Sequence, residues 1–243
     1  MVIAIIGILA GLLLPALSQG KQRALTVACQ NNLKQLAICW HSYAGDNEDV
    51  MVPNNFVYLV SVGSSTNSSL GEDSLTWCRG ITPLDTNEIT ATTSLLFNYN
   101  QTAAIYHCPA DRSTVEGFPG KLRNRSYNMS NSIQCWQDNH FRKFGDILVP
   151  SNLFVFIDTH EDAIWDSTFG TLQLNSRYQD YWLDVPANRH QRGANLTFAD
   201  GHVERWQWKF PKSGYLFAEH YVNNDDRDDL RRMQQHIKGQ GGN

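Results

Sequence analysis

Two kinds of helix are joined in one continuous stretch at the start of the chain, MVIAIIGILAGLLLPALSQGKQRALTVACQNNLKQLAICWHSYAGD (residues 1–46). This stretch is the main determinant of the fold. Residues 1–17 are apolar throughout, and the first charged side chain is that of Lys21. A helix of this composition must bury its whole circumference, in lipid or among other helices. As a helix the apolar segment rises about 25 Å, slightly less than the roughly 30 Å apolar core of a bilayer.

Three interpretations of this segment compete: a membrane anchor, a secretory signal peptide and a core helix of a soluble fold. We favour the anchor. A signal peptide would carry basic residues before its apolar run. Gly7, Gly11 and Pro15 weaken an isolated core helix. Because a proline inside a helix costs about 3 kcal/mol, residues 7–15 should either bend or melt, or carry only a harmless kink.

After the apolar run the pattern becomes amphipathic. One stripe of apolar side chains recurs at steps of three and four residues: Leu25, Cys29, Leu33, Leu36, Trp40 and Tyr43. This spacing is typical of a helix with one face on a folded domain. The opposite face is polar, and Gly45 and Asp46 should end the helix.

Composition limits the function. The chain has 243 residues, of which 42% are hydrophobic and 18% charged, and these values are typical of a globular protein. Its net charge of -4, with lysine and arginine scattered along the chain, argues against nucleic acid as a partner. Because no Walker loop, GxSxG, HExxH or dinucleotide fingerprint is present, we predict that the protein is not an enzyme.

The second half of the chain indicates a sheet. LFVFID (153–158) predicts a buried central strand. ANLTFA and HVERWQW flank Asp200 and Gly201, which predicts a hairpin with a two-residue type I′ turn. That turn would pair Phe198 with Val203. With the hairpin packed on the amphipathic helix, the expected fold class is α+β: a long N-terminal helix on a C-terminal antiparallel sheet.

The region between them is less regular. The Ser/Asn-rich stretch 61–69 should be a flexible loop, and residues 56–60 form a short apolar run before it. TSLLFNYN (93–100) is compatible with a short helix or a strand.

Two groups of polar residues are candidates for a site. The strand at 194–199 would span about 17 Å, with Asp200 at one end and His190 beyond the other, so the two should not share an ion. His190 should cap the strand entry by hydrogen bonds from both ring nitrogens, and Asp200 with Gly201 should form the turn. A crowded acidic segment could hold calcium, but a solvated loop is the commoner outcome. We therefore predict no metal or cofactor, with calcium as the alternative at Asp158, Glu161, Asp162 and Asp166.

These segments resemble a known family. VIAIIGILAGLLLPAL followed by CQNNLKQLA is similar to the N-terminal region of bacterial type IV pilin-like proteins, especially the type II secretion pseudopilins. YHCPADRS (106–113), RSYNMSN (125–131), PSNLFVFIDTH (150–160) and His190 followed after nine residues by Asp200-Gly201 resemble the prepilin-like branch named for an H-X9-DG segment. The resemblance covers residues 2–45 and about 105–208.

The resemblance implies a structural subunit of a pilus or pseudopilus. Residues 1–45 would be the membrane anchor and filament core, 46–222 a pilin-like α+β domain, and 223–243 a charged tail with a short exposed helix from about Asp226 to Lys238. The subunit would lie in the bacterial inner membrane before assembly and then in a periplasmic or cell-surface filament. Its partners would be copies of itself or other pilins, and the pilus or secretion assembly machinery. The implied filament-core residues are Val2, Ile3, Ile5, Ile6, Ile8, Leu9, Leu12, Leu13, Leu14, Pro15 and Leu17.

Two further expectations follow from the resemblance. The family's basic leader, which a peptidase cleaves, should precede Met1 in a longer gene product.

Cys29 and Cys108 lie in two family landmarks, so a disulfide between them would tie the helix to the loop before the sheet, and Cys78 with Cys135 could form a second bond. Sequence does not fix this connectivity. Cys39, next to Ile38 and Trp40, should be a buried free thiol.

Two other functions stay open. A membrane-tethered extracytoplasmic module could bind ligands or glycans through exposed tryptophans, for which the candidates are Trp77, Trp136, Trp165, Trp182, Trp206 and Trp208. A calcium-dependent hydrolase could use the segment around Asp158.

Overall fold

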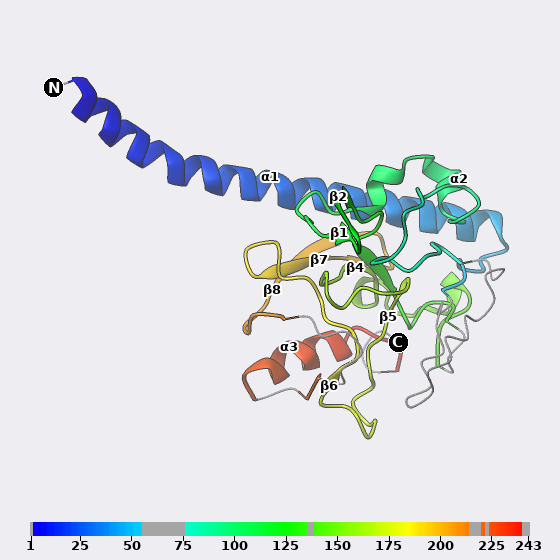
Figure 1. Cartoon of the computed structure of the whole chain (residues 1–243). Coiled ribbons are helices and arrows are strands. Elements are labelled where there is room, and N and C mark those ends of the chain that lie inside the picture. The colour runs from blue at the N-terminus through cyan, green and yellow to red at the C-terminus, as the bar shows by residue number, and fades with distance from the viewer. Residues whose placement is uncertain (1, 55–75, 136–138, 214–219, 222–223, 240–243) are drawn as a thin grey trace.

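A computed structural model describes residues 2–54, 76–135, 139–213, 220–221 and 224–239. The first helix, α1 (Val2–Asp46), runs along one side of a five-stranded sheet and extends well past it, whereas the last helix, α3 (Asn224–Gln234), lies on the other side (Figure 1). The predicted α+β class and the N-terminal helix are therefore confirmed. The predicted loop at 61–69 and the apolar run at 56–60 lie outside the described residues.

The central sheet has the strand order β5-β3-β4-β7-β8. These strands are β3 (Tyr127–Ser130), β4 (Phe154–Asp158), β5 (Thr168–Phe169), β7 (Gly193–Phe198) and β8 (Val203–Gln207). Every residue of β4 is buried, as the apolar run predicts for a central strand. The sheet is mixed rather than purely antiparallel, because β5 pairs in parallel with β3.

Shorter elements surround this sheet. They are α2 (Phe97–Asn100), β1 (Thr114–Val115), β2 (Phe118–Leu122), β6 (Tyr181–Trp182), β9 (His220–Tyr221) and the 3-10 turns Ala103–Tyr106, Phe144–Asp146 and Pro150–Asn152. The helix α2 resolves the choice left open for TSLLFNYN. Strands β1 and β2 pair with each other, as do β6 and β9.

The second half of α1 packs on the sheet as its apolar stripe predicts. Cys29, Leu33, Leu36 and Trp40 are fully buried, and they share one hydrophobic cluster with Phe156 of β4. The helix ends at Asp46, in agreement with the predicted stop. It is continuous through Pro15, so residues 7–15 do not melt, although Figure 1 shows the helix curving in its first half.

The hairpin between β7 and β8 differs from the prediction by one residue. Thr197 pairs with Val203, so the predicted pairing of Phe198 with Val203 is wrong. The Phe198 amide donates to the His202 carbonyl, which leaves a three-residue loop. Within it only Gly201 has a positive φ, of 84°. A type I′ turn needs two such residues, whereas a three-residue loop needs one, and glycine supplies it without strain.

The predicted exposure of the tail helix is wrong. Leu230 and Met233 of α3 are buried in a second hydrophobic cluster with Trp206. The Lys212 ammonium, itself buried, pairs with the carboxylates of Asp226 and Asp229 from α3. A charged sequence suggested a solvated end, but these charges neutralise one another inside the fold.

Candidate functional site

The first half of α1 carries exposed apolar side chains. Residues 11–20 are all exposed, Pro15 among them. The large apolar side chains on this half are between 55% and 71% exposed: Ile6, Leu9, Leu12, Leu13, Leu14 and Leu17. The side chains of the other predicted filament-core residues, Val2, Ile3, Ile5 and Ile8, lie outside the described part of the structure. No helix among the described residues has the combined length and apolarity needed to cross a bilayer.

The second feature is a buried group of four metal-ligating side chains, which we name the four-donor cluster. It contains Cys29 of α1, Cys108 of the loop after the 3-10 turn 103–106, Asp158 at the end of β4 and His190 just before β7. One donor atom of each residue lies within 4.8 Å of the others. All four side chains are at most 1% exposed.

The imidazole of His190 is the centre of this cluster. Its Nε2 lies 3.3 Å from the Cys108 sulfur and 3.1 Å from Asp158 Oδ2. Its Nδ1 lies 3.2 Å from the hydroxyl of Thr26 on α1. A cysteine-histidine-aspartate relay for nucleophilic catalysis needs the thiol and the carboxylate on opposite ring nitrogens. Because both groups face Nε2 and the cluster is buried, this arrangement does not form such a relay.

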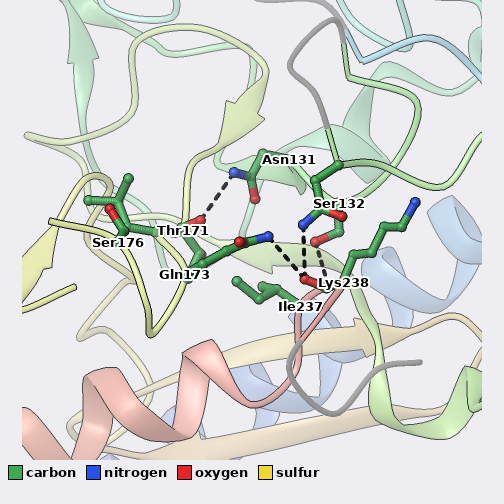
Figure 2. Close-up of a pocket in the computed structure, with 9 residues that line it drawn as sticks. Asn131, Ser132, Thr171, Gln173, Ser176, Ile237 and Lys238 are labelled. Atoms are coloured by element: carbon green, nitrogen blue, oxygen red, sulfur yellow. Dashed lines mark hydrogen bonds between the residues drawn. The ribbon is translucent and has the colours of Figure 1, made fainter. Parts of the chain in front are cut away.

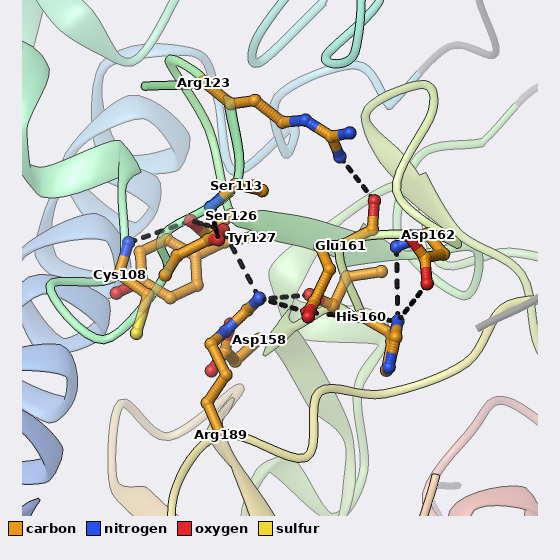
Figure 3. A network of polar contacts seen from close by, with 12 residues as sticks. Cys108, Ser113, Arg123, Ser126, Tyr127, Asp158, His160, Glu161, Asp162 and Arg189 are labelled. Carbon is orange, nitrogen blue, oxygen red and sulfur yellow. Dashed lines mark hydrogen bonds and ion pairs between the residues drawn. The ribbon is translucent and has the colours of Figure 1, made fainter. Parts of the chain in front are cut away.

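A network of polar contacts centred on Arg189 adjoins Asp158 and the loop of Cys108 (Figure 3). The guanidinium of Arg189 donates to Asp158 Oδ1 at 2.7 Å and to Glu161 Oε2 at 2.8 Å. It also lies 3.4 Å from Asp111 Oδ2, which accepts a hydrogen bond from Ser126 Oγ. Arg189 therefore links the carboxylate of β4 to the loop that carries Cys108.

The buried charges shift one another's pKa values. Burial lowers the pKa of His190, but hydrogen bonds to Asp158 and Cys108 outweigh it and raise that pKa to about 9. Burial also raises the pKa of the Cys108 thiol far above its usual range. At Asp111, burial favours the neutral acid, but the Arg189 charge and the Ser126 hydrogen bond have the larger combined effect and lower its pKa. These shifts favour the protonated form of the His190 imidazole and the neutral form of the Cys108 thiol.

Comparison with known proteins gives no further guidance. No protein-family model, curated protein or solved structure matches the chain. The functional argument therefore depends on the geometry of the two features above.

The structure changes the predicted role of His190. Its ring does not cap the strand entry; it points into the four-donor cluster, and Gly193 and Arg205 bond only to its main chain. Asp200 lies outside this cluster and instead contacts His202 at 2.5 Å in the turn. Among the described residues, His190 and Asp200 therefore belong to different groups of side chains.

The four acidic calcium candidates do not gather. Arg189 occupies the space between Asp158 and Glu161. Asp162 is 65% exposed and lies beside His160. The Asp166 carboxylate accepts from the Thr168 amide instead, and burial raises its pKa to about 6. Of these candidates, Asp158 alone belongs to a potential metal-ligating group among the described residues, together with Cys29, Cys108 and His190.

All five cysteines are buried and none of them forms a disulfide, so neither predicted bond is present. Cys29 and Cys108 do approach each other, as the resemblance implies, but without a bond. The Cys78 sulfur lies 3.4 Å from the Arg125 guanidinium. Cys39 is the buried free thiol that the sequence predicts, and burial raises its pKa to about 11.

A pocket of about 240 Å³ lies elsewhere, between the segment after β3 and the end of the chain (Figure 2). Its polar groups largely bond to one another. Ser132 Oγ accepts from the Lys238 amide, Gln173 donates to the Lys238 carbonyl, and Asn131 donates to the Thr171 carbonyl. Lys238 is the one titratable side chain among the residues that line the pocket, and its ammonium donates to the His140 carbonyl at 2.6 Å.

The candidate tryptophans that the structure describes do not form a binding platform on the surface. Trp77, Trp182, Trp206 and Trp208 are at most 2% exposed, and Trp165 is partly buried. Trp136 lies outside the described residues. These positions weaken the case for a tethered glycan-binding module.

Proposed function

We propose that this protein is a structural subunit of a pilin-type filament and that it assembles through the first half of α1. The observation that carries the proposal is the row of exposed apolar side chains on this half, from Ile6 to Leu17. Removing apolar surface from water contributes about 25 cal/mol per Å². A helix that leaves so much of this surface uncovered needs a partner.

The distribution of these side chains favours several partners over one. Leu12, Leu13 and Leu14 are consecutive and all 67–71% exposed. Successive residues of a helix are rotated by about 100°, so three in a row face most of the circumference. A single neighbour covers one side only. The interior of a bundle, where each helix is surrounded by copies of itself, covers all sides.

The way the helix is held supports the same proposal. Its second half is fixed to the sheet by buried residues such as Leu33 and Trp40, so each copy would present its first half in the same orientation. Contacts of a head-to-tail kind need not close into a ring and can propagate as a filament. Before assembly we propose that the apolar half lies in the bacterial inner membrane, and that assembly machinery transfers it to the filament. The proposed role is structural rather than catalytic.

The test uses two exposed leucines as a matched pair. Leu13 lies on the projecting half of α1 and is 67% exposed, whereas Leu148 lies on the globular domain and is 77% exposed. In the full chain, Leu13→Arg should abolish filaments because it places a charge inside the proposed bundle, while Leu148→Arg should leave them intact. Electron microscopy and sedimentation of chains expressed with their assembly machinery would measure this.

Both side chains are exposed in the single chain, so neither substitution should alter thermal unfolding. Filaments formed equally by both variants would contradict the proposal. Loss of filaments in both would place the contact on the domain surface and would also contradict it.

A further inference from the structure

We propose that the four-donor cluster is a zinc site in which Cys29, Cys108, Asp158 and His190 each supply one ligand. Cysteine sulfur, histidine nitrogen and carboxylate oxygen are the ligands of protein-bound zinc, and four protein ligands with no open position are typical of a structural site. The four residues come from four separate segments of the chain. This inference does not depend on the proposed filament.

The distances fit a tetrahedral ion. Zinc bonds of about 2.0–2.3 Å place neighbouring ligand atoms about 3.3–3.8 Å apart. His190 Nε2 lies 3.3 Å from the Cys108 sulfur and 3.1 Å from Asp158 Oδ2, and all four donor atoms lie within 4.8 Å of one another. Because the donor atoms lie within 4.8 Å of one another, inward shifts of about 1 Å or less would complete the geometry.

The groups around the cluster orient the ligands. Thr26 donates its hydroxyl hydrogen to the Gln22 carbonyl at 2.9 Å, so its oxygen is available to accept from His190 Nδ1. That contact favours the tautomer whose Nε2 lone pair points at the other donors. Fixing one ring nitrogen in this way is typical of metal-bound histidine.

The other ligands have outer partners of the same kind. Arg189 holds Asp158 through Oδ1, which leaves the buried Oδ2 directed at the cluster, 3.1 Å from His190 Nε2. The hydroxyl of Tyr127 donates to the Cys29 sulfur at 3.2 Å, a contact that would stabilise a thiolate.

A divalent ion would also offset most of the ligand charge. Two thiolates and one carboxylate around Zn²⁺ leave a net charge of about −1, and the Arg189 guanidinium, which also faces Asp111 and Glu161, lies against the carboxylate ligand. Bound zinc would fasten α1 to the loop at Cys108, to β4 and to the start of β7. The ion would thereby lock the helix on the domain.

The wild-type chain provides the first test. Protein purified without chelator should contain one zinc per chain by elemental analysis. A strong chelator should lower Tm by several degrees, and Zn²⁺ but not Mg²⁺ should restore it. Cobalt in place of zinc should give the sulfur-to-metal charge-transfer band of a thiolate site.

Two cysteines on α1 form a matched pair for the second test. Cys29 and Cys39 are both buried free thiols, but only Cys29 belongs to the cluster. Cys29→Ser should lose the charge-transfer intensity and bind zinc at least tenfold more weakly, while Cys39→Ser should keep both.

Three results would overturn the proposal. One is a wild-type chain that takes up no zinc and whose Tm is indifferent to added Zn²⁺. The second is a chain, as purified, in which peptide mapping finds a disulfide between Cys29 and Cys108, because these two sulfurs could then not bind a metal. The third is equal zinc binding by the two serine variants.

Discussion

The two halves of α1 are one continuous helix in two different environments. In the second half, Leu33, Leu36 and Trp40 are fully buried against the sheet, and the cluster ligand Cys29 lies among them. In the first half, Leu12, Leu13 and Leu14 are about two-thirds exposed or more. The first half is the more apolar in sequence and yet the less buried in the single chain. The hydrophobicity of a segment therefore predicts how much of its surface needs burial. Whether other residues of the same chain bury that surface depends on the fold.

Because of this contrast, substitutions in the two halves of α1 should have different effects. Substitutions in the packed half should change the free energy of unfolding of the domain. Substitutions in the projecting half should leave it unchanged and should affect only contacts with other molecules. Three experiments compare the halves, beginning with the largest expected effect.

The largest difference is expected from the same leucine deletion made in each half. Leu33→Ala removes a fully buried side chain from the cluster that joins α1 to β4, and it should cost about 2–5 kcal/mol. Leu13→Ala changes a side chain that is 67% exposed and should stay within about 0.5 kcal/mol. Thermal unfolding in mild detergent, followed by near-ultraviolet circular dichroism, measures both. Equal losses would show that the first half also folds onto the domain.

A smaller effect is expected from the lysines of the two halves. Lys34 Nζ donates to the Gly201 carbonyl at 2.5 Å and so links the helix to the β7–β8 turn. Lys34→Met should cost about 1 kcal/mol, because the bond is partly exposed. Lys21→Met on the exposed first half is the control and should be neutral. A neutral Lys34→Met would mean that the helix does not depend on this link.

The smallest effect is a dependence on pH. Burial lowers the pKa of His41 on the packed half, with a further contribution from the Lys34 charge and an opposing one from Asp200. The unfolded chain then binds the proton more readily, so His41 destabilises the fold as pH falls below about 6.5. Tm measured at about pH 8 and pH 5.5 should fall less in His41→Gln than in the wild type. An identical fall in both proteins would contradict this assignment.

Much of the fold is predictable from local pattern. The stripe from Leu25 to Tyr43 predicts the packed face of α1, and LFVFID predicts the buried strand β4. The hairpin is predicted in position but not in register, because aspartate followed by glycine permits both a two-residue and a three-residue loop. Of the loop residues 199–201, only Gly201 has a positive φ, which is the backbone pattern of the three-residue loop.

The candidate zinc site is much less predictable. Its ligands are far apart in sequence, at Cys29, Cys108, Asp158 and His190, and none of the usual zinc-ligand spacings is present. The sequence analysis singles out each of these residues for a different reason. The predicted disulfide between Cys29 and Cys108 is the one expectation that brings two of the four together. Their convergence follows from how α1 crosses the sheet, which short-range periodicity does not encode.

Three properties of α1 are predictable from the sequence alone: it is a helix, its first half needs burial, and its second half has one apolar face. Those properties depend on residues three or four positions apart, which are neighbours in any helix. The packing of α3 against the domain, with Lys212 paired to Asp226 and Asp229, and the approach of four distant donors are visible only in the three-dimensional structure. Such contacts are set by long-range packing, in which a charged side chain can be buried once its partner is brought to it.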